Sequence, residues 1–122
     1  MSDLLRRYAE LAVRVGANLE RGQILEVTAF LEHAPLVREV ARCAYRDGAA
    51  YVDVLWIDQH VRRAMIELAP EERLSWTPPW LVQRLEEHVA RRAAHVAITG
   101  EAEPRADGRS RPAASGVRGR TS

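Results

Sequence analysis

Lysine is absent from this 122-residue chain, in which all 18 basic residues are arginines. The absence excludes chemistry that needs an amine, such as Schiff-base catalysis, a lysine general base or the lysine of a phosphate-binding P-loop. Cysteine is almost absent, and the single thiol, Cys43, cannot form an internal disulfide. Because Cys43 lies within an apolar helical pattern, we expect it to be buried and inert.

Long hydrophobic runs are also missing. No stretch approaches the ~18 apolar residues that a membrane-spanning helix needs. Residues 1–7 include an acid and two arginines and have no apolar signal core. We therefore expect a soluble, cytoplasmic protein with no membrane partner.

The net charge of +1 divides unevenly along the chain. Residues 1–103 carry 13 arginines against 16 acidic residues, a balance of −3, and residues 104–122 carry 5 against one, a balance of +4. An acidic body argues against nucleic-acid binding, which needs a concentrated basic surface. Residues 104–122 are rich in Gly, Ser, Pro and Arg and cannot bury a face, so we predict one domain (1–103) and a disordered basic tail (104–122).

The apolar spacing predicts alternating helices and strands. Helices are expected at 4–15, 35–47, 59–68 and 80–94, a helical turn at 71–76, and strands at 23–30, 49–57 and 95–99. Pro35 suits the first turn of a helix, and Gly48 suits a left-handed helix cap. This order predicts a three-layer α/β fold with helices flanking a parallel sheet. Because three strands are few for such a sheet, we expect it to be partial.

Motifs that carry catalysis are missing from this scaffold. Residues 31–35, after the first strand, contain no glycine, so a dinucleotide pyrophosphate could not approach the backbone there. No pair of histidines has the spacing of a zinc site. Glu86, Glu87 and His88 are adjacent, and neighbours on a helix diverge. We expect the four histidines (His33, His60, His88 and His95) to lie at the surface or at helix ends.

Four further positions carry specific expectations. His33 and Asp58 follow the first two strands, where open α/β sheets place ligands. We expect His33 to cap a helix or face solvent and Asp58 to cap a helix, with contact to a small ligand or substrate as the alternative for both. Asp53 interrupts an apolar strand, so we expect it near a sheet edge or paired with an arginine. We expect Trp56, Trp76 and Trp80 to pack between the sheet and the proline-rich turn, with an exposed aromatic patch as the alternative.

Several segments, taken in order, resemble a known enzyme family. Residues 8–19 followed by 21–23 are similar to the opening of the thermophilic metallo-aminopeptidases of the aminopeptidase T and S type. Residues 34–38 and 44–49 resemble the start and the close of that family's next helix. The later matching segments are 51–54, 58–63, 69–72 and 79–81. The resemblance covers about residues 4–103.

The resemblance implies a cytoplasmic exopeptidase that removes amino-terminal residues from peptides with the help of two divalent metal ions. It also implies homodimers of two-domain chains several times longer than this one, with the Glu, His, Tyr and Asp metal ligands in the carboxyl-terminal domain. No catalytic or metal residue is therefore carried onto this chain, and we expect it to bind no catalytic metal and to be inactive alone. The alternatives are a stand-alone small-ligand or regulatory module, or a subunit that pairs with an intact homologue or with itself through an unpaired strand edge.

Overall fold

The computed structural model describes residues 3–100 and confirms an α/β fold. The α-helices are α1 (Asp3–Leu11), α2 (Ala34–Arg46), α3 (Gln59–Leu68) and α4 (Pro79–Ala90). The strands are β1 (Ile24–Phe30), β2 (Tyr51–Ile57) and β3 (Ala94–Ile98). Three short helical turns are η1 (Ala12–Gly16), η2 (Leu31–His33) and η3 (Glu71–Arg73). The predicted basic tail, 104–122, lies outside the described residues.

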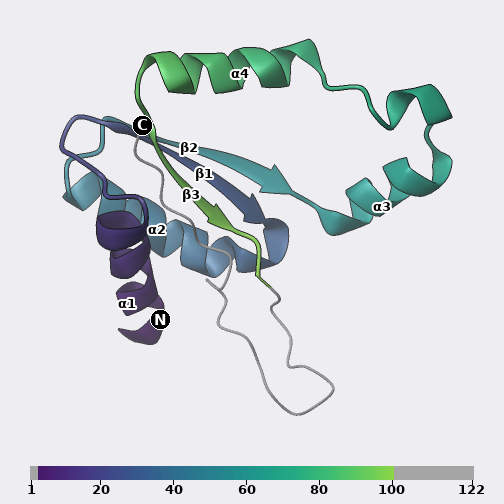
Figure 1. Cartoon of the computed structure of the whole chain (residues 1–122). Helices are drawn as coiled ribbons and strands as arrows, with labels where there is room; N and C mark the ends of the chain where they lie inside the picture. The colour runs from purple at the N-terminus through teal and green to yellow at the C-terminus, as the bar shows by residue number, and fades with distance from the viewer. Residues whose placement is uncertain (1–2, 101–122) are drawn as a thin grey trace.

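The three strands form one parallel sheet in the order β2-β1-β3. Helix α2 covers one face of the sheet, with α1 packed beside it, and α4 crosses over the other face (Figure 1). The predicted three-layer arrangement with a partial parallel sheet is therefore confirmed. Because β1 is central and covered on both faces, it lacks the simple alternation of a half-exposed strand.

The apolar core lies between the sheet and the α1–α2 layer. Alternate residues of the strands point to this layer, and they meet small and branched residues of the helices. The fully buried members of this core with the largest side chains are Leu25, Leu36, Ile98, Val13, Val27, Val37, Val40 and Val96. Each such side chain stabilises the fold by about 1.5–3 kcal/mol relative to its exposed state.

Cys43 also belongs to this core. Its exposed fraction is 2%, which confirms the predicted burial. Burial raises the pKa of the thiol, with a further contribution from the negative charge of Asp47. The thiol therefore remains protonated and a poor nucleophile at neutral pH.

Both ends of α2 lie where the sequence predicts them. Gly48 has a φ of +97°, as expected of a left-handed residue after α2, and Pro35 lies in the first turn of that helix. The first helix differs from expectation, because the α-helix ends at Leu11 and a π-helical turn continues to Gly16. That turn keeps both Ala12 and Val13 in the core.

The last helix is shorter than predicted. Helix α4 ends at Ala90 rather than 94, because Arg92 adopts a left-handed conformation with a φ of +54° and turns the chain into β3. The tryptophan prediction is wrong. Trp56, Trp76 and Trp80 are 42%, 45% and 67% exposed, and Trp76 packs edge-on against Trp80 with 5.8 Å between ring centroids. This agrees with the alternative of exposed aromatic residues.

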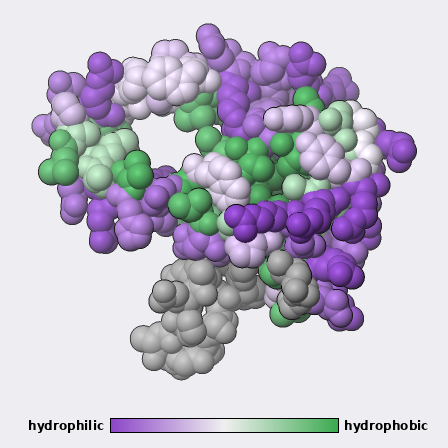
Figure 2. Space-filling view, turned by 180° about the vertical axis from the view of Figure 1, so that it is seen from behind, coloured by the Kyte–Doolittle hydropathy of each residue, from purple (hydrophilic) through white to green (hydrophobic). Residues whose placement is uncertain are grey.

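Helices α3 and α4 stand apart from the core. Neither contains a buried residue. Figure 2 shows apolar side chains on the part of the molecule that carries α3 and η3, and an opening between that part and the sheet. The exposed apolar residues from α3 to η3 and just beyond it are Val61, Met65, Ile66, Leu68 and Leu74. None of the helices in the described part of the chain is long and apolar enough to cross a membrane.

Candidate functional site

The face of the sheet beneath α4 carries a row of polar residues, one from each strand. The strand register places Asp53 of β2 and His95 of β3 opposite Glu26 of the central strand. Thr28 lies two residues beyond Glu26 and therefore points to the same face. The sheet thus has one apolar face and a second face on which this polar row lies among apolar residues.

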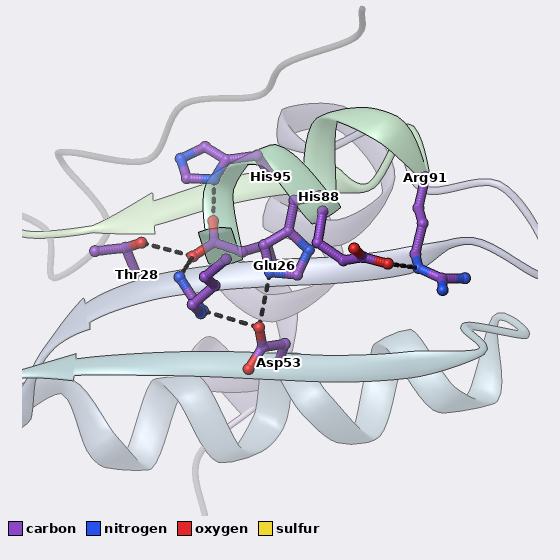
Figure 3. A network of polar contacts seen from close by, with 8 residues as sticks. Glu26, Thr28, Asp53, His88, Arg91 and His95 are labelled. Atoms are coloured by element: carbon purple, nitrogen blue, oxygen red, sulfur yellow. Dashed lines mark hydrogen bonds and ion pairs between the residues drawn. The ribbon is translucent and has the colours of Figure 1, made fainter. Parts of the chain in front are cut away.

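Glu26 is the most deeply buried member of this row, with a side chain only 4% exposed. Its carboxylate accepts hydrogen bonds from Thr28 Oγ1 at 2.9 Å and from His95 Nδ1, and it lies 3.0 Å from Arg84 Nη1 (Figure 3). Burial alone would raise the pKa of Glu26, but these hydrogen bonds and the charges of His95 and Arg84 outweigh it and lower the pKa. Glu26 is therefore held in the ionised form.

Helix α4 contributes the cation that joins the row. Arg84 and His88 are four residues apart and so lie on the same side of the helix. Arg84 Nη2 lies 3.0 Å from Asp53 Oδ2, and His88 Nε2 donates a hydrogen bond to the same oxygen at 2.7 Å (Figure 3). Arg84 Nη2 has no hydrogen-bond partner in the described part of the chain, so its contact with Asp53 is an ion pair without hydrogen-bond geometry. Charged and polar groups therefore attach α4 to the sheet.

Two apolar residues of α4, Leu85 and Val89, do not cover the sheet. They are 52% and 72% exposed. The side of α4 that carries Arg84 and His88 turns inward, where Arg84 pairs with the two carboxylates on the sheet. An orientation of α4 with Leu85 and Val89 turned inward would leave the carboxylates of the sheet without Arg84, and burial of an unpaired carboxylate is unfavourable.

This cluster does not fit a metal ion. No group of three or more His, Cys, Asp or Glu within residues 3–100 has the arrangement of a metal site. In the polar row, the guanidinium of Arg84 lies within 3.0 Å of both carboxylates, Glu26 and Asp53, where it supplies the positive charge that a metal would supply. We therefore derive no metal-dependent step through these residues.

A cleft of about 160 Å³ opens beside the polar row, between α4 and β3. Polar and apolar residues line it: Glu26, Leu85, His88, Val89, Ala93, Ala94 and His95. The Nδ1 atom of His88 is buried and has no hydrogen-bond partner among residues 3–100. The other ring nitrogen, Nε2, hydrogen-bonds to Asp53 Oδ2.

The structure corrects the prediction for His33. The residue occupies the N-cap position of α2, but its side chain makes no capping hydrogen bond. It is 3% exposed, and its Nε2 donates a hydrogen bond to the carbonyl oxygen of Gly100. The side chain therefore neither caps the helix nor faces solvent, because the backbone just after β3 passes over it.

Two other predictions are confirmed. Asp58 caps α3 by accepting a hydrogen bond from the backbone N–H of His60 at 2.9 Å. Asp53 lies on the edge strand β2 and also pairs with an arginine, Arg84. Neither His33 nor Asp58 lines the cleft beneath α4 or the hollow of about 370 Å³ on α3. The structure thus engages both candidate ligand residues in hydrogen bonds within the fold, His33 with the distant Gly100 and Asp58 with the neighbouring His60.

Sequence reasoning missed Glu26 and the inward side of α4. The available signal was Glu26 and Thr28 at alternate positions of an otherwise apolar strand, which predicts a polar face. His88 and His95 were expected at the surface or at helix ends. His88 does lie in the last turn of α4, but both side chains are only partly exposed, 15% and 32%, and each hydrogen-bonds to a carboxylate.

Comparison with known proteins shows which family this chain resembles. The family described as Thermophilic metalloprotease (M29) matches residues 1–117. Aminopeptidase T of Thermus thermophilus is 43% identical over 96 residues, and aminopeptidase 2 of Geobacillus stearothermophilus is 44% identical over 94. These matches cover 79% and 77% of this chain but only 24% and 23% of the relatives.

A solved structure agrees with the sequence matches. Wild-type AmpT from Thermus thermophilus superposes with a TM-score of 0.71 at 42% identity, over 80% of this chain and 24% of that one. This chain therefore spans about a quarter of the length of the relatives that it matches. On this likeness of sequence and fold, the chain belongs to the thermophilic metalloprotease family.

Proposed function

We propose that this chain supplies the amino-terminal α/β module of a metal-dependent aminopeptidase that removes amino-terminal residues from peptides. The observation that carries the proposal is the 43% identity with aminopeptidase T over 96 residues. A match at this level over 79% of the chain favours a common role for the module in both proteins.

The metal chemistry belongs, in this proposal, to the part of the relatives outside the match. Two divalent ions there would activate a water molecule and polarise the peptide carbonyl. Two features support this division: residues 3–100 hold no cluster that fits a metal, and Arg84 neutralises the nearest pair of carboxylates. The chain on its own is then a scaffold without catalytic activity.

A subunit that associates with an intact homologue is the second candidate. The observation that favours it is the lack of any buried residue in α3 and α4. Amphipathic helices in a folded domain normally bury one side, so these helices suit contact with more protein. The homodimer and the cytoplasmic location implied by the resemblance remain predictions of the same proposal.

The test is an activity assay on the purified 122-residue chain. Leucine amide and a leucine dipeptide would be incubated with the chain and with Zn²⁺, Co²⁺ or Mn²⁺ in turn, and released leucine would be measured. We expect no release above a metal-only blank, while aminopeptidase T of Thermus thermophilus assayed in parallel releases leucine. Release by this chain that requires metal and is abolished by a chelator would contradict the proposed division.

A further inference from the structure

The outer edge of strand β2 is closed at one point by a side chain. Strand β2 pairs with β1 on one side, and no strand within residues 3–100 pairs with its other side. The backbone N–H of Val52 donates a hydrogen bond at 3.0 Å to the hydroxyl oxygen of Tyr45, which lies in the last turn of α2. This N–H therefore points away from β1 and already has an acceptor. Edge strands otherwise present unpaired N–H and C=O groups, to which another strand can bind.

The place of Tyr45 at this edge is explained by the hydrogen bond better than by burial. Tyr45 is 49% exposed, although its neighbour Ala44 is fully buried in the core. A tyrosine can lie along apolar surface while its hydroxyl bonds to a polar group, here a backbone N–H. A strand that added beside β2 would need both this N–H and the space that the hydroxyl occupies.

A charge on the same strand acts in the same direction. Asp53, which follows Val52, points to the face beneath α4 and pairs there with Arg84. Inward-pointing charges on an edge strand disfavour the addition of another strand, because the incoming residue beside them must match the charge. The first half of β2 is therefore blocked by Tyr45 and Asp53. The second half, residues 54–57, has no charged side chain, and Trp56 within it is 42% exposed.

We propose that the Tyr45 hydroxyl keeps β2 the terminal strand of the sheet and prevents a second copy of this chain from pairing with its outer edge. A second copy is the partner to exclude, because two identical edges can pair antiparallel about a two-fold axis. The apolar second half of β2 favours such pairing. Loss of the hydroxyl would free the Val52 N–H in both copies at once. This role concerns assembly and is independent of the proposed catalytic function.

The test removes the hydroxyl and keeps the ring. Tyr45→Phe is compared with Tyr51→Phe, a matched control on β2 itself, where Tyr51 is 59% exposed. A double variant adds Trp56→Lys to Tyr45→Phe and so places a charge on the unblocked half of the edge. All variants are made in the full 122-residue chain. The readouts are sedimentation equilibrium over a range of protein concentrations, and hydrogen exchange of the Val52 amide at a concentration where the chain is monomeric.

We expect Tyr45→Phe to speed exchange of the Val52 amide by at least ~10-fold, because the amide loses its acceptor. Self-association should tighten by at least ~10-fold relative to the parent and to Tyr51→Phe, since two closed edges are released in each dimer. Trp56→Lys should return the double variant to the association of the parent.

Three outcomes would overturn the proposal. Unchanged exchange at Val52 would show that the hydroxyl does not hold this N–H. Unchanged association of a folded Tyr45→Phe chain would show that the contact does not protect the edge. Association that Trp56→Lys fails to reverse would assign it to another surface of the molecule.

Discussion

Removal of the guanidinium of Arg84 tests whether charge attaches α4 to the sheet. Arg84→Met keeps the aliphatic stem and deletes the cation that lies 3.0 Å from both Glu26 and Asp53. Glu26 then stays ionised with a side chain only 4% exposed, and its remaining partners are Thr28 and His95. The variant therefore leaves a buried carboxylate without its arginine.

The magnitude follows from the burial of each partner. Breaking a buried ion pair by removal of one member costs about 3–5 kcal/mol. Because Glu26 retains two hydrogen-bond donors, its share lies at or below the lower end of that range, about 2–3 kcal/mol. Asp53, which is 31% exposed, retains His88 and contributes less, about 0.5 kcal/mol. We expect a total of about 3 kcal/mol in the free energy of unfolding.

The assay is urea unfolding of the full chain, followed by far-ultraviolet circular dichroism. A loss of about 3 kcal/mol would lower the urea midpoint by about 1–3 M. Arg91→Met is the matched control, because Arg91, the C-cap residue of α4, pairs with Glu87 of that helix with both side chains about 60% exposed. We expect this control to change the free energy of unfolding by less than about 0.5 kcal/mol.

Two outcomes would refute the reasoning. Equal losses for Arg84→Met and Arg91→Met would mean that the buried row does not stabilise the attachment of α4. A second test places Arg84→Met in a Glu26→Gln background, where the cost should fall because the buried charge is gone. An unchanged cost in that background would show that Arg84 acts through packing rather than through Glu26.

Two further predictions concern the dependence of stability on pH and the turn glycine Gly48. The folded pKa of Glu26 lies below its ordinary value of 4.5, so the unfolded chain takes up the proton first, and the free energy of unfolding should fall as pH drops through this range. Glu26→Gln should flatten that fall in urea midpoints measured from pH 7 to pH 3, and an identical slope would contradict the assignment. Gly48→Ala should destabilise the fold more than Gly22→Ala, since both have positive φ but only the new Cβ at Gly48 meets a side chain, Arg21 Cγ at 2.7 Å. We expect about 1–2 kcal/mol of backbone strain at each site and a further loss at Gly48, and equal thermal shifts would contradict the contact.

The arrangement of the fold could be predicted from the sequence because its signals are local. Gly48 needs a left-handed conformation, Pro35 starts a helix, and Asp58 caps one, and each is found as predicted. The parallel sheet followed from the alternation of strands and helices. The predicted helix ends were less accurate where a single backbone conformation decides them, as at Arg92.

The polar row could be predicted only in part, because it depends on contacts between distant segments. The sequence indicated that Asp53 needs an edge position or an arginine, but it does not say which arginine. Arg84 becomes the partner only when the register sets Asp53 beside Glu26 and α4 crosses above them. The burial of His33 likewise depends on Gly100, which is 67 residues away along the chain.

The two faces of the sheet should tolerate amino-acid substitutions under different conditions. On the face packed against α2, residues such as Leu25 and Val96 belong to a close-packed apolar core. A substitution there should be tolerated when it preserves the side-chain volume. Against α4, Glu26, Arg84 and Asp53 are held by charge balance, so a change of one residue requires a compensating change in another. Divergence among related sequences should then proceed by single steps on the first face and by linked steps on the second.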